Sequence, residues 1–295
     1  MEERFFFENE GAHVYAVLHT PPADMPARQE GVVLCHPLLD FDLYEVPWTI
    51  RMIVGYAREL ARLGYPALRF DFRGAGLSDG EFEQLTLSSC VSDLQRAVDV
   101  LVERTGVTEV VLIGWRLGAT VAMRVGARNP RVRRLVLWDP VPDPHGSLQA
   151  VFRRVRASLV AMGRSPDSLP GLGPPVGDAP GGTWGLLQPN QNRLDAGGYV
   201  IGPAFLEEIK SWDSSADVRA FRGRVLILQL IRGWSGGAGL RRALVQLDEA
   251  YRAAGAESQL LEVMDVHPAE WFKQPDYSRV FEATSAWLTE GAGVR

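Results

Sequence analysis

The sequence predicts an α/β fold: a mostly parallel, eight-stranded sheet with helices on both faces and an inserted lid. From Gly31 onward, apolar runs of four to seven residues alternate with amphipathic helical stretches, which is typical of parallel strands covered on both faces. The chain has 295 residues and is 46% hydrophobic. That is enough for one large core with an insertion, which we prefer to two separate domains.

Two antiparallel strands, RFFFE and VYAVLHT, are expected to begin the sheet, joined by a turn at Asn9-Glu10-Gly11. Six more strands and five helices follow along the chain. The expected strands are 32–35, 66–72, 109–114, 134–139, 224–230 and 258–264, and the expected helices are approximately 47–63, 87–105, 117–128, 238–254 and 277–289.

The composition changes sharply after Pro140. A predicted helix at 146–162 is followed by SPDSLPGLGPPVGDAPGGTWG, which is too rich in Pro and Gly for regular structure. A second helix near 203–210 leads back to the sheet. We therefore divide the chain into a first core part (1–140), a lid insertion (141–215) and a second core part (216–295).

An insertion between two late strands lies above the carboxyl edge of a parallel sheet, where a lid would cover a binding site. The alternative is a decorative loop or a disordered linker. Four aromatic residues give the insertion apolar surface for packing: Trp184, Tyr199, Phe205 and Trp212.

Charge and composition limit the partners. The net charge of -5 and the pI near 5.6 provide no basic surface for nucleic acid or anionic membranes. The N-terminal MEERFFFENE lacks the features of a signal peptide, and no apolar run is long enough to span a membrane. We expect a cytoplasmic protein of bacterial composition, in which Cys35 and Cys90 are reduced thiols. Its expected partner is a small-molecule substrate, without a cofactor or metal. A homodimer is also possible from the sequence.

One glycine-rich motif follows the strand at 66–72. Residues 71–78, DFRGAGLS, match D-x-R-G-x-G-x-S. Gly74 and Gly76 permit a tight turn that a Cβ atom would obstruct, and Asp71 and Arg73 are expected to tie this turn together. We assign the motif a structural role.

The segment VLIGWRLGA (111–119) breaks from a buried strand into a helix. This is the context of the nucleophile elbow, G-x-S-x-G, in which the central side chain projects into the active site from a strained turn. Gly114 and Gly118 are in place, but Arg116 stands where the serine is expected. A guanidinium stays protonated and cannot form an acyl-enzyme.

On these motifs the chain resembles the α/β-hydrolase superfamily over almost its full length. Within it, the G-x-R-L-G-A elbow, the loop Cys35-His36-Pro37 and the segment 198–203, GYVIGP, are similar to the exosortase A system-associated hydrolases. The resemblance implies an α/β-hydrolase fold with a degenerate catalytic triad. It also implies that arginine at the elbow is a recurrent arrangement with its own use.

The resemblance also indicates where the other catalytic groups lie. His267, in the segment Asp265-Val266-His267-Pro268, occupies the position of the catalytic histidine; the alternative is an ordinary loop histidine. The usual acid position after Leu230 offers no carboxylate in RVLILQLIRGWSGGAG. Asp139 is the alternative acid, which would orient His267. Asp265 competes with it, and a simple capping role for Asp139 is equally open.

The loop after the strand at 32–35 corresponds to the one that supplies an oxyanion-hole amide in hydrolases. Pro37 has no N–H, so an oxyanion site must use the backbone N–H groups of Leu38 and Leu117, with His36 beside them. Cys35 is the only thiol near the expected site. We interpret it as a small core residue rather than a substitute nucleophile.

Two roles are open for Arg116. It can anchor a carboxylate, phosphate or enolate oxygen in a largely apolar pocket. Alternatively, it pairs with Asp139 or Asp42 and closes a dead site. Trp115, Trp138 and Trp234 are candidate pocket walls, although each is also an ordinary core candidate.

Three functions follow. The leading one is non-hydrolytic or atypical acid–base chemistry (isomerisation, epimerisation, cyclisation or elimination), in which Arg116 holds an anionic oxygen and His267 moves a proton. The second is a pseudoenzyme that binds a small molecule or a protein partner. The third is ester or thioester hydrolysis by water that His267 activates.

Overall fold

A computed structural model describes residues 1–38, 46–149, 187–188, 193–196, 199–230, 238–263 and 277–290. Its main feature is an eight-stranded sheet in the order β1-β2-β4-β3-β5-β6-β10-β11. β2 runs antiparallel to β1 and β4, whereas β4, β3, β5, β6, β10 and β11 are mutually parallel. The predicted fold class is confirmed.

The strands of the large sheet are β1 (Glu2–Asn9), β2 (Ala12–His19), β3 (Glu30–Cys35), β4 (Ala67–Phe70), β5 (Glu109–Trp115), β6 (Val132–Trp138), β10 (Arg224–Leu230) and β11 (Glu257–Val263). The helices are α1 (Val46–Arg62), η1 (Phe82–Gln84, a 3-10 turn), α2 (Leu87–Thr105), α3 (Leu117–Arg128), α5 (Pro203–Ser211), α6 (Ser215–Ala220), α7 (Ala238–Ala253) and α8 (Ser278–Glu290). A small antiparallel sheet comprises β7 (Leu187–Gln188), β8 (Arg193–Ala196) and β9 (Tyr199–Ile201).

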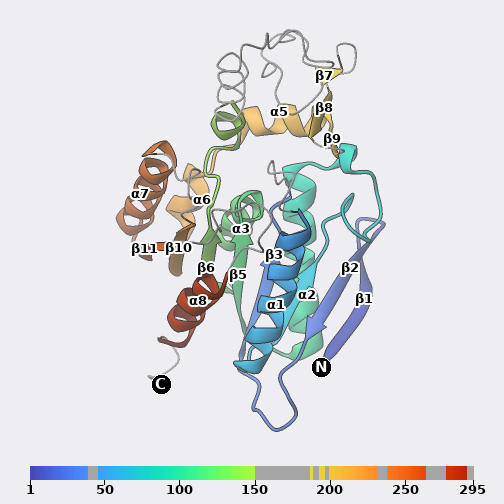
Figure 1. Cartoon of the computed structure of the whole chain (residues 1–295), viewed down its shortest axis with the longest axis vertical. Helices are drawn as coiled ribbons and strands as arrows, with labels where there is room; N and C mark the ends of the chain where they lie inside the picture. The colour runs from blue at the N-terminus through green and yellow to red at the C-terminus, as the bar shows by residue number, and fades with distance from the viewer. Residues whose placement is uncertain are drawn as a thin grey trace.

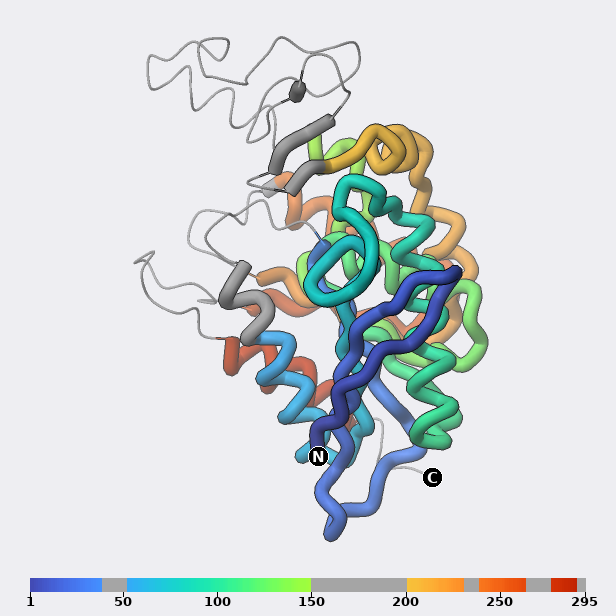
Figure 2. Tube along the Cα trace, turned by 90° about the vertical axis from the view of Figure 1, so that its right-hand side faces the viewer, coloured from blue at the N-terminus to red at the C-terminus, as the bar shows by residue number. Residues whose placement is uncertain are grey.

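Helices cover both faces of the large sheet (Figures 1 and 2). On one face, the sheet packs against α1 and α8 around the aromatic side chains of Tyr56, Trp138 and Trp287. On the other face, α2, α3, α6 and α7 pack around a second and larger apolar cluster. Burial on both faces explains the nearly continuous apolar runs of the parallel strands.

The part of the chain assigned to the lid returns to the core at an identifiable place. Gly202 lies against the carbonyl oxygen of Glu83 in η1, so close that a Cβ atom at 202 would overlap it. From there α5 begins, and Glu208 of α5 accepts hydrogen bonds from the backbone N–H of Ser88 at the start of α2. In Figure 1, α5 and the small sheet lie at the end of the molecule opposite the N-terminus.

Of the predicted helix at 146–162, the structure describes only the beginning, in which residues 144–149 are helical. The rest lies outside the described residues. Within the described ranges, none of the helices combines the length and apolar character required to span a membrane.

Candidate functional site

Arg116 has the backbone conformation of a strained elbow. It follows β5 directly and precedes α3, with φ 51° and ψ -116°. A positive φ is uncommon for a residue with a side chain and stores strain, which the surrounding structure must balance. The N–H group of Arg116 donates to the carbonyl oxygen of Trp138, 2.9 Å away, which fixes the turn beside the end of β6.

The two glycines of the elbow are required by close packing. A Cβ atom at Gly114 would overlap the backbone of Gly118 and Ala119, which follow on the other side of the turn. At Gly118 it would overlap the carbonyl oxygen of His36. The predicted G-x-R-x-G elbow is therefore present in its geometry as well as in its sequence.

The elbow places Arg116 at the positive end of α3. The carbonyl oxygen of Arg116 accepts from the N–H groups of Ala119 and Thr120, at 3.0 and 3.2 Å. The N–H groups of Leu117 and Gly118 belong to the first turn, where an α-helix has no internal acceptor for them. The positive end of the α3 dipole and the positively charged guanidinium of Arg116 therefore lie together, and both favour binding of an anion.

The loop after β3 engages one of the two expected oxyanion donors. Leu38 has φ 58°, and its N–H donates to Nδ1 of His36 over 3.3 Å. Nε2 of His36 lies 3.3 Å from the N–H of Phe72, and the imidazole stands edge-on to the Phe72 ring. His36 therefore joins this loop to the one after β4, and Leu117 remains the better-placed donor.

Cys35 is a core residue, as expected. Its side chain is buried in the cluster beneath α2 and α3. Burial raises the pKa of the Cys35 thiol far above its usual value, so it stays protonated. A protonated, inaccessible thiol is a poor nucleophile.

Asp139 is held by the neighbouring strand. It follows β6 with φ 43° and is buried. Its N–H donates to the carbonyl oxygen of Leu228, and its Oδ1 accepts from the N–H of Leu230, both at 2.8 Å. The carboxylate of Asp139 therefore lies beside the end of β10, next to the position from which the acid is usually supplied.

The structure places two of the predicted pocket tryptophans in the core under α1 and α8. Trp115 is fully buried and lies edge-on to Tyr277, with ring centroids 6.0 Å apart. Trp138 packs against Tyr56, and its indole N–H donates to the Thr284 hydroxyl over 3.1 Å. Both indoles are therefore buried in the apolar core between the sheet and these helices.

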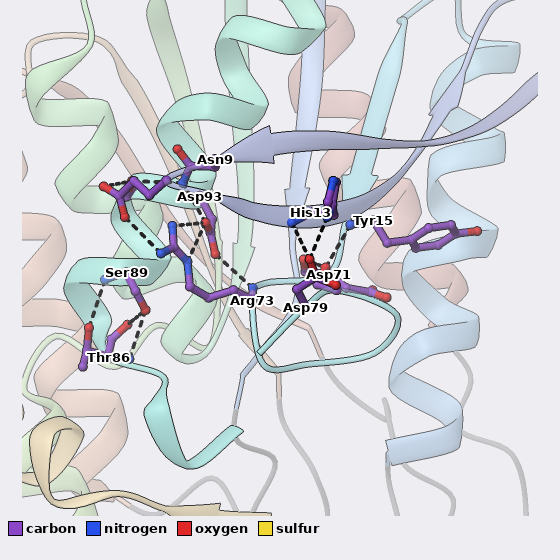
Figure 3. Close-up of polar contacts among 12 residues, drawn as sticks. Asn9, His13, Tyr15, Asp71, Arg73, Asp79, Thr86, Ser89 and Asp93 are labelled. Atoms are coloured by element: carbon purple, nitrogen blue, oxygen red, sulfur yellow. Dashed lines mark hydrogen bonds and ion pairs between the residues drawn. The ribbon is translucent and has the colours of Figure 1, made fainter. Parts of the chain in front are cut away.

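The D-x-R-G-x-G-x-S loop is fastened differently from the expected Asp71–Arg73 pair. Figure 3 shows Arg73 directed at Asp93 of α2, with Nη2 2.7 Å from Oδ1. Asn9 also donates to Asp93, and Asp71 accepts instead from the N–H of Leu77 within the loop. Arg73 pairs with Asp93 because the Asp93 carboxylate is fully buried and needs a cation. Sequence reasoning missed Asp93, although a carboxylate on the apolar face of α2 was a usable signal.

The turn of this loop is tight, as predicted. Gly74 and Gly76 have φ 76° and 56°, and a Cβ atom at Gly76 would overlap the Asp71 carboxylate. The hydroxyl of Ser78 donates to the carbonyl oxygen of Asp71 and accepts from the N–H of Tyr15.

Four of the residues considered for the site lie outside the described part of the chain, namely Asp42, Trp234, Asp265 and His267, as does Trp184 of the lid insertion. The geometry available for the site is therefore that of Arg116, Leu117, His36, Leu38 and Asp139. Among the residues with described side chains, no group of three or more His, Cys, Asp or Glu is arranged to hold a metal ion.

Comparison with known proteins identifies the fold. Residues 46–165 match the family described as serine aminopeptidase, S33. No curated protein has a sequence that matches the chain. The solved structures similar to it include the ferulic acid complex of Est1E from Butyrivibrio proteoclasticus, with a TM-score of 0.67 and 19% identity over 97% of this chain and 98% of that one.

Two more similar structures are the esterase Pf2001 of Pyrococcus furiosus and the complex of DcsB with its substrate analogue. The first has a TM-score of 0.61 and 13% identity over 98% of this chain and 92% of that one. The second has a TM-score of 0.62 and 15% identity over 98% of this chain and 99% of that one. Together with the sheet order, these similarities show that the chain has the α/β-hydrolase fold.

Proposed function

We propose that this chain of α/β-hydrolase fold is an enzyme whose elbow anchors an anionic oxygen and whose chemistry is proton transfer rather than acyl transfer. The observation that supports the proposal is the position of Arg116: a permanent cation on the strained turn at the start of α3. A serine at this position would attack a carbonyl, whereas a guanidinium only binds and polarises one.

The proposed roles divide among three residues. Arg116 binds a carboxylate or a developing enolate oxygen, assisted by the N–H of Leu117 and the dipole of α3. His267 takes a proton from the carbon next to the carbonyl group, and the electron pair of that C–H bond moves to the oxygen held by Arg116. Asp139, which the N–H of Leu230 fixes at the end of β6, orients His267 and stabilises its protonated form.

The enolate formed in this step can react further in three ways. Delivery to the same carbon from the other face gives epimerisation, and delivery to another atom gives isomerisation. Expulsion of a leaving group from the adjacent carbon gives elimination. In each case a segment that covers the site, residues 141–215 in this proposal, would exclude water from the enolate.

The proposal is tested by proton exchange in D2O. Purified protein is incubated with a panel of 2-oxo acids and 1,3-dicarbonyl compounds, and loss of the acidic C–H signal is followed by proton NMR. We expect exchange above the buffer rate with at least one compound, a loss of at least about 100-fold in His267→Ala, and a comparable loss in Arg116→Gln. Arg128→Gln, at the far end of α3, is the matched control and should retain activity.

A second candidate is suggested by the similar structure Pf2001, which is described as an esterase: hydrolysis of esters or thioesters by water activated by His267. It predicts slow p-nitrophenyl acetate hydrolysis that resists fluorophosphonates and disappears in His267→Ala. If neither exchange nor hydrolysis is detected while Arg116 still binds anions, the chain acts as a binding protein and the enzymatic proposal is wrong.

A further inference from the structure

A cavity lies at the amino edge of the sheet, remote from the elbow. It has a volume of about 530 Å³ and lies between β1, the end of β2 and the second half of α1. Its place in the fold follows from the register, because His19 at the end of β2 pairs with Ala67, the first residue of β4. In Figure 1 this is the end of the molecule marked by the N-terminus, opposite α5.

His19 lines this cavity with an unused hydrogen-bonding group. The imidazole is 1% exposed, and its Nε2 accepts from Nε of Arg69 over 3.2 Å. Burial, followed by the charge of Arg69, lowers the pKa of His19 from 6.5 to about 4, so the ring is neutral at neutral pH. Because Nε2 accepts, the single ring proton is assigned to Nδ1. Among the described residues, Nδ1 has no hydrogen-bond partner.

The carboxylate of Glu2 lines this cavity and indicates that its charged groups bind a carboxylate. Its Oε1 accepts from Nε of Arg58 over 2.6 Å, but lies 3.7 Å from Nδ1 of His19, beyond hydrogen-bonding distance. The carboxylate of Glu2 therefore satisfies Arg58 and leaves the N–H of His19 unmet. An unmet buried donor costs free energy, which a better-placed acceptor would recover.

The rest of the lining suits an anion with an apolar part. Arg58 and Arg62 stand four residues apart on α1 and therefore share one face of the helix. Arg62 pairs with Glu59 at 3.2 Å, an exposed contact that is readily exchanged. Pro22 and Ala61 add apolar wall between these charges and the strands.

We propose that this cavity is a binding site for a small organic carboxylate. The ligand displaces the carboxylate of Glu2 from Arg58, accepts a hydrogen bond from Nδ1 of His19, and packs its apolar part against Pro22 and Ala61. Arg62 at the rim contributes charge attraction. Glu2 then acts as a built-in competitor that occupies the site when no ligand is present.

The test uses benzoate as the probe and NMR of the histidine side chains as the readout. Titration should shift the ring signals of His19, with saturation in the millimolar range or tighter. Arg58→Ala should weaken binding about tenfold through the loss of a charge-assisted bond. Glu2→Ala should strengthen it severalfold by removing the competitor. Arg96→Ala, which breaks the Arg96–Glu103 pair on α2, is the matched control and should leave the affinity unchanged.

A general charge effect on an anion would also give opposite signs for the Arg58 and Glu2 variants, so the comparison of Arg58→Ala with Arg96→Ala, which removes the same charge on α2, separates specific binding from it. An Arg116→Gln background removes binding at the elbow, so a His19 shift that persists there reports this cavity alone. The proposal is overturned if benzoate leaves the His19 signals unmoved, or if Arg58→Ala and Arg96→Ala weaken the affinity equally. Acetate, which lacks the apolar part, should bind more weakly than benzoate.

Discussion

The carboxylate of Asp139 accepts a hydrogen bond from the backbone N–H of Leu230 across the ends of two neighbouring parallel strands. The N–H of Asp139 in turn donates to the carbonyl oxygen of Leu228. The side chain thus continues the β6–β10 ladder by one hydrogen bond beyond the last paired residues, Trp138 and Leu228. These two hydrogen bonds to β10 hold the carboxylate at the carboxyl edge of the sheet.

Asp139→Leu should therefore destabilise the protein more than Asp139→Asn. Leucine leaves the N–H of Leu230 without its acceptor, which costs about 1–3 kcal/mol, and it tolerates the φ of 43° poorly. Asparagine retains an acceptor oxygen and is more common at positive φ. Urea unfolding of the two variants measures the difference; equal losses would show that the hydrogen bond to Leu230 contributes little.

Gly118→Ala should disrupt the elbow. The added Cβ atom meets the carbonyl oxygens of Cys35 and His36, which are backbone atoms and cannot rotate away. We expect a loss of about 2 kcal/mol or more in the free energy of unfolding, measured by chemical denaturation. Gly239→Ala in α7 is the control: no atom lies within 4 Å of its Cβ position, so its stability should be unchanged or slightly higher.

Arg73 and Asp93 should behave as a coupled buried pair. Arg73→Ala leaves the fully buried carboxylate of Asp93 without its cation, and we expect a loss of about 3–5 kcal/mol. The double variant Arg73→Met/Asp93→Leu should lose less than the sum of the single variants, because no uncompensated charge remains. A double-mutant cycle by urea denaturation measures the coupling. Strict additivity would contradict the pairing shown in Figure 3.

Most of the fold was predictable because its signals are local. The strand 224–230 matches β10 to the residue, and the helices 87–105 and 117–128 match α2 and α3. Local residues fix both ends of α2: a Thr86–Ser89 capping box begins the helix, and Gly106 in the left-handed conformation ends it. Strands of two to four residues, such as β7, β8 and β9, carry too few residues for a period to be recognised.

The candidate site was predictable in part. The elbow followed from two glycines at a fixed spacing, whereas the partner of Arg73 lies 20 residues away on another element and no local pattern identifies it. The burial of Trp115 had a readable signal. Val111, Ile113 and Trp115 alternate along β5, so all three face the same side of the sheet and the same core.

The stability of the protein should fall on acidification in a way that depends on His19. Burial lowers the pKa of His19 to about 4 in the folded protein, against an ordinary value of 6.5. Below pH 6.5 the unfolded chain therefore binds a proton that the folded chain does not, and stability is lost as the pH falls from about 6.5 to about 4. His19→Gln removes this contribution.

Urea midpoints measured from pH 8 to pH 4.5 test this prediction. The difference between the wild-type and His19→Gln midpoints should be constant above pH 7 and should change steadily below it, in favour of the variant. Parallel curves over the whole range would contradict a buried neutral His19.

Arg116→Ser should convert the elbow into a reactive one if the backbone turn is independent of the side chain. The close contacts at Gly114 and Gly118 and the N–H bond of residue 116 to Trp138 hold this turn, and these contacts do not use the arginine side chain. A serine would then stand on the same turn at the start of α3, with Leu117 as oxyanion donor.

We expect a fluorophosphonate probe to label the Arg116→Ser variant, detected by intact mass, and not to label the wild type. Arg116→Ala, which has no hydroxyl, is the control. Because a nucleophile also needs a base, the double variant Arg116→Ser/His267→Ala should label at least about 100-fold more slowly; equal rates would remove His267 from the proposed site.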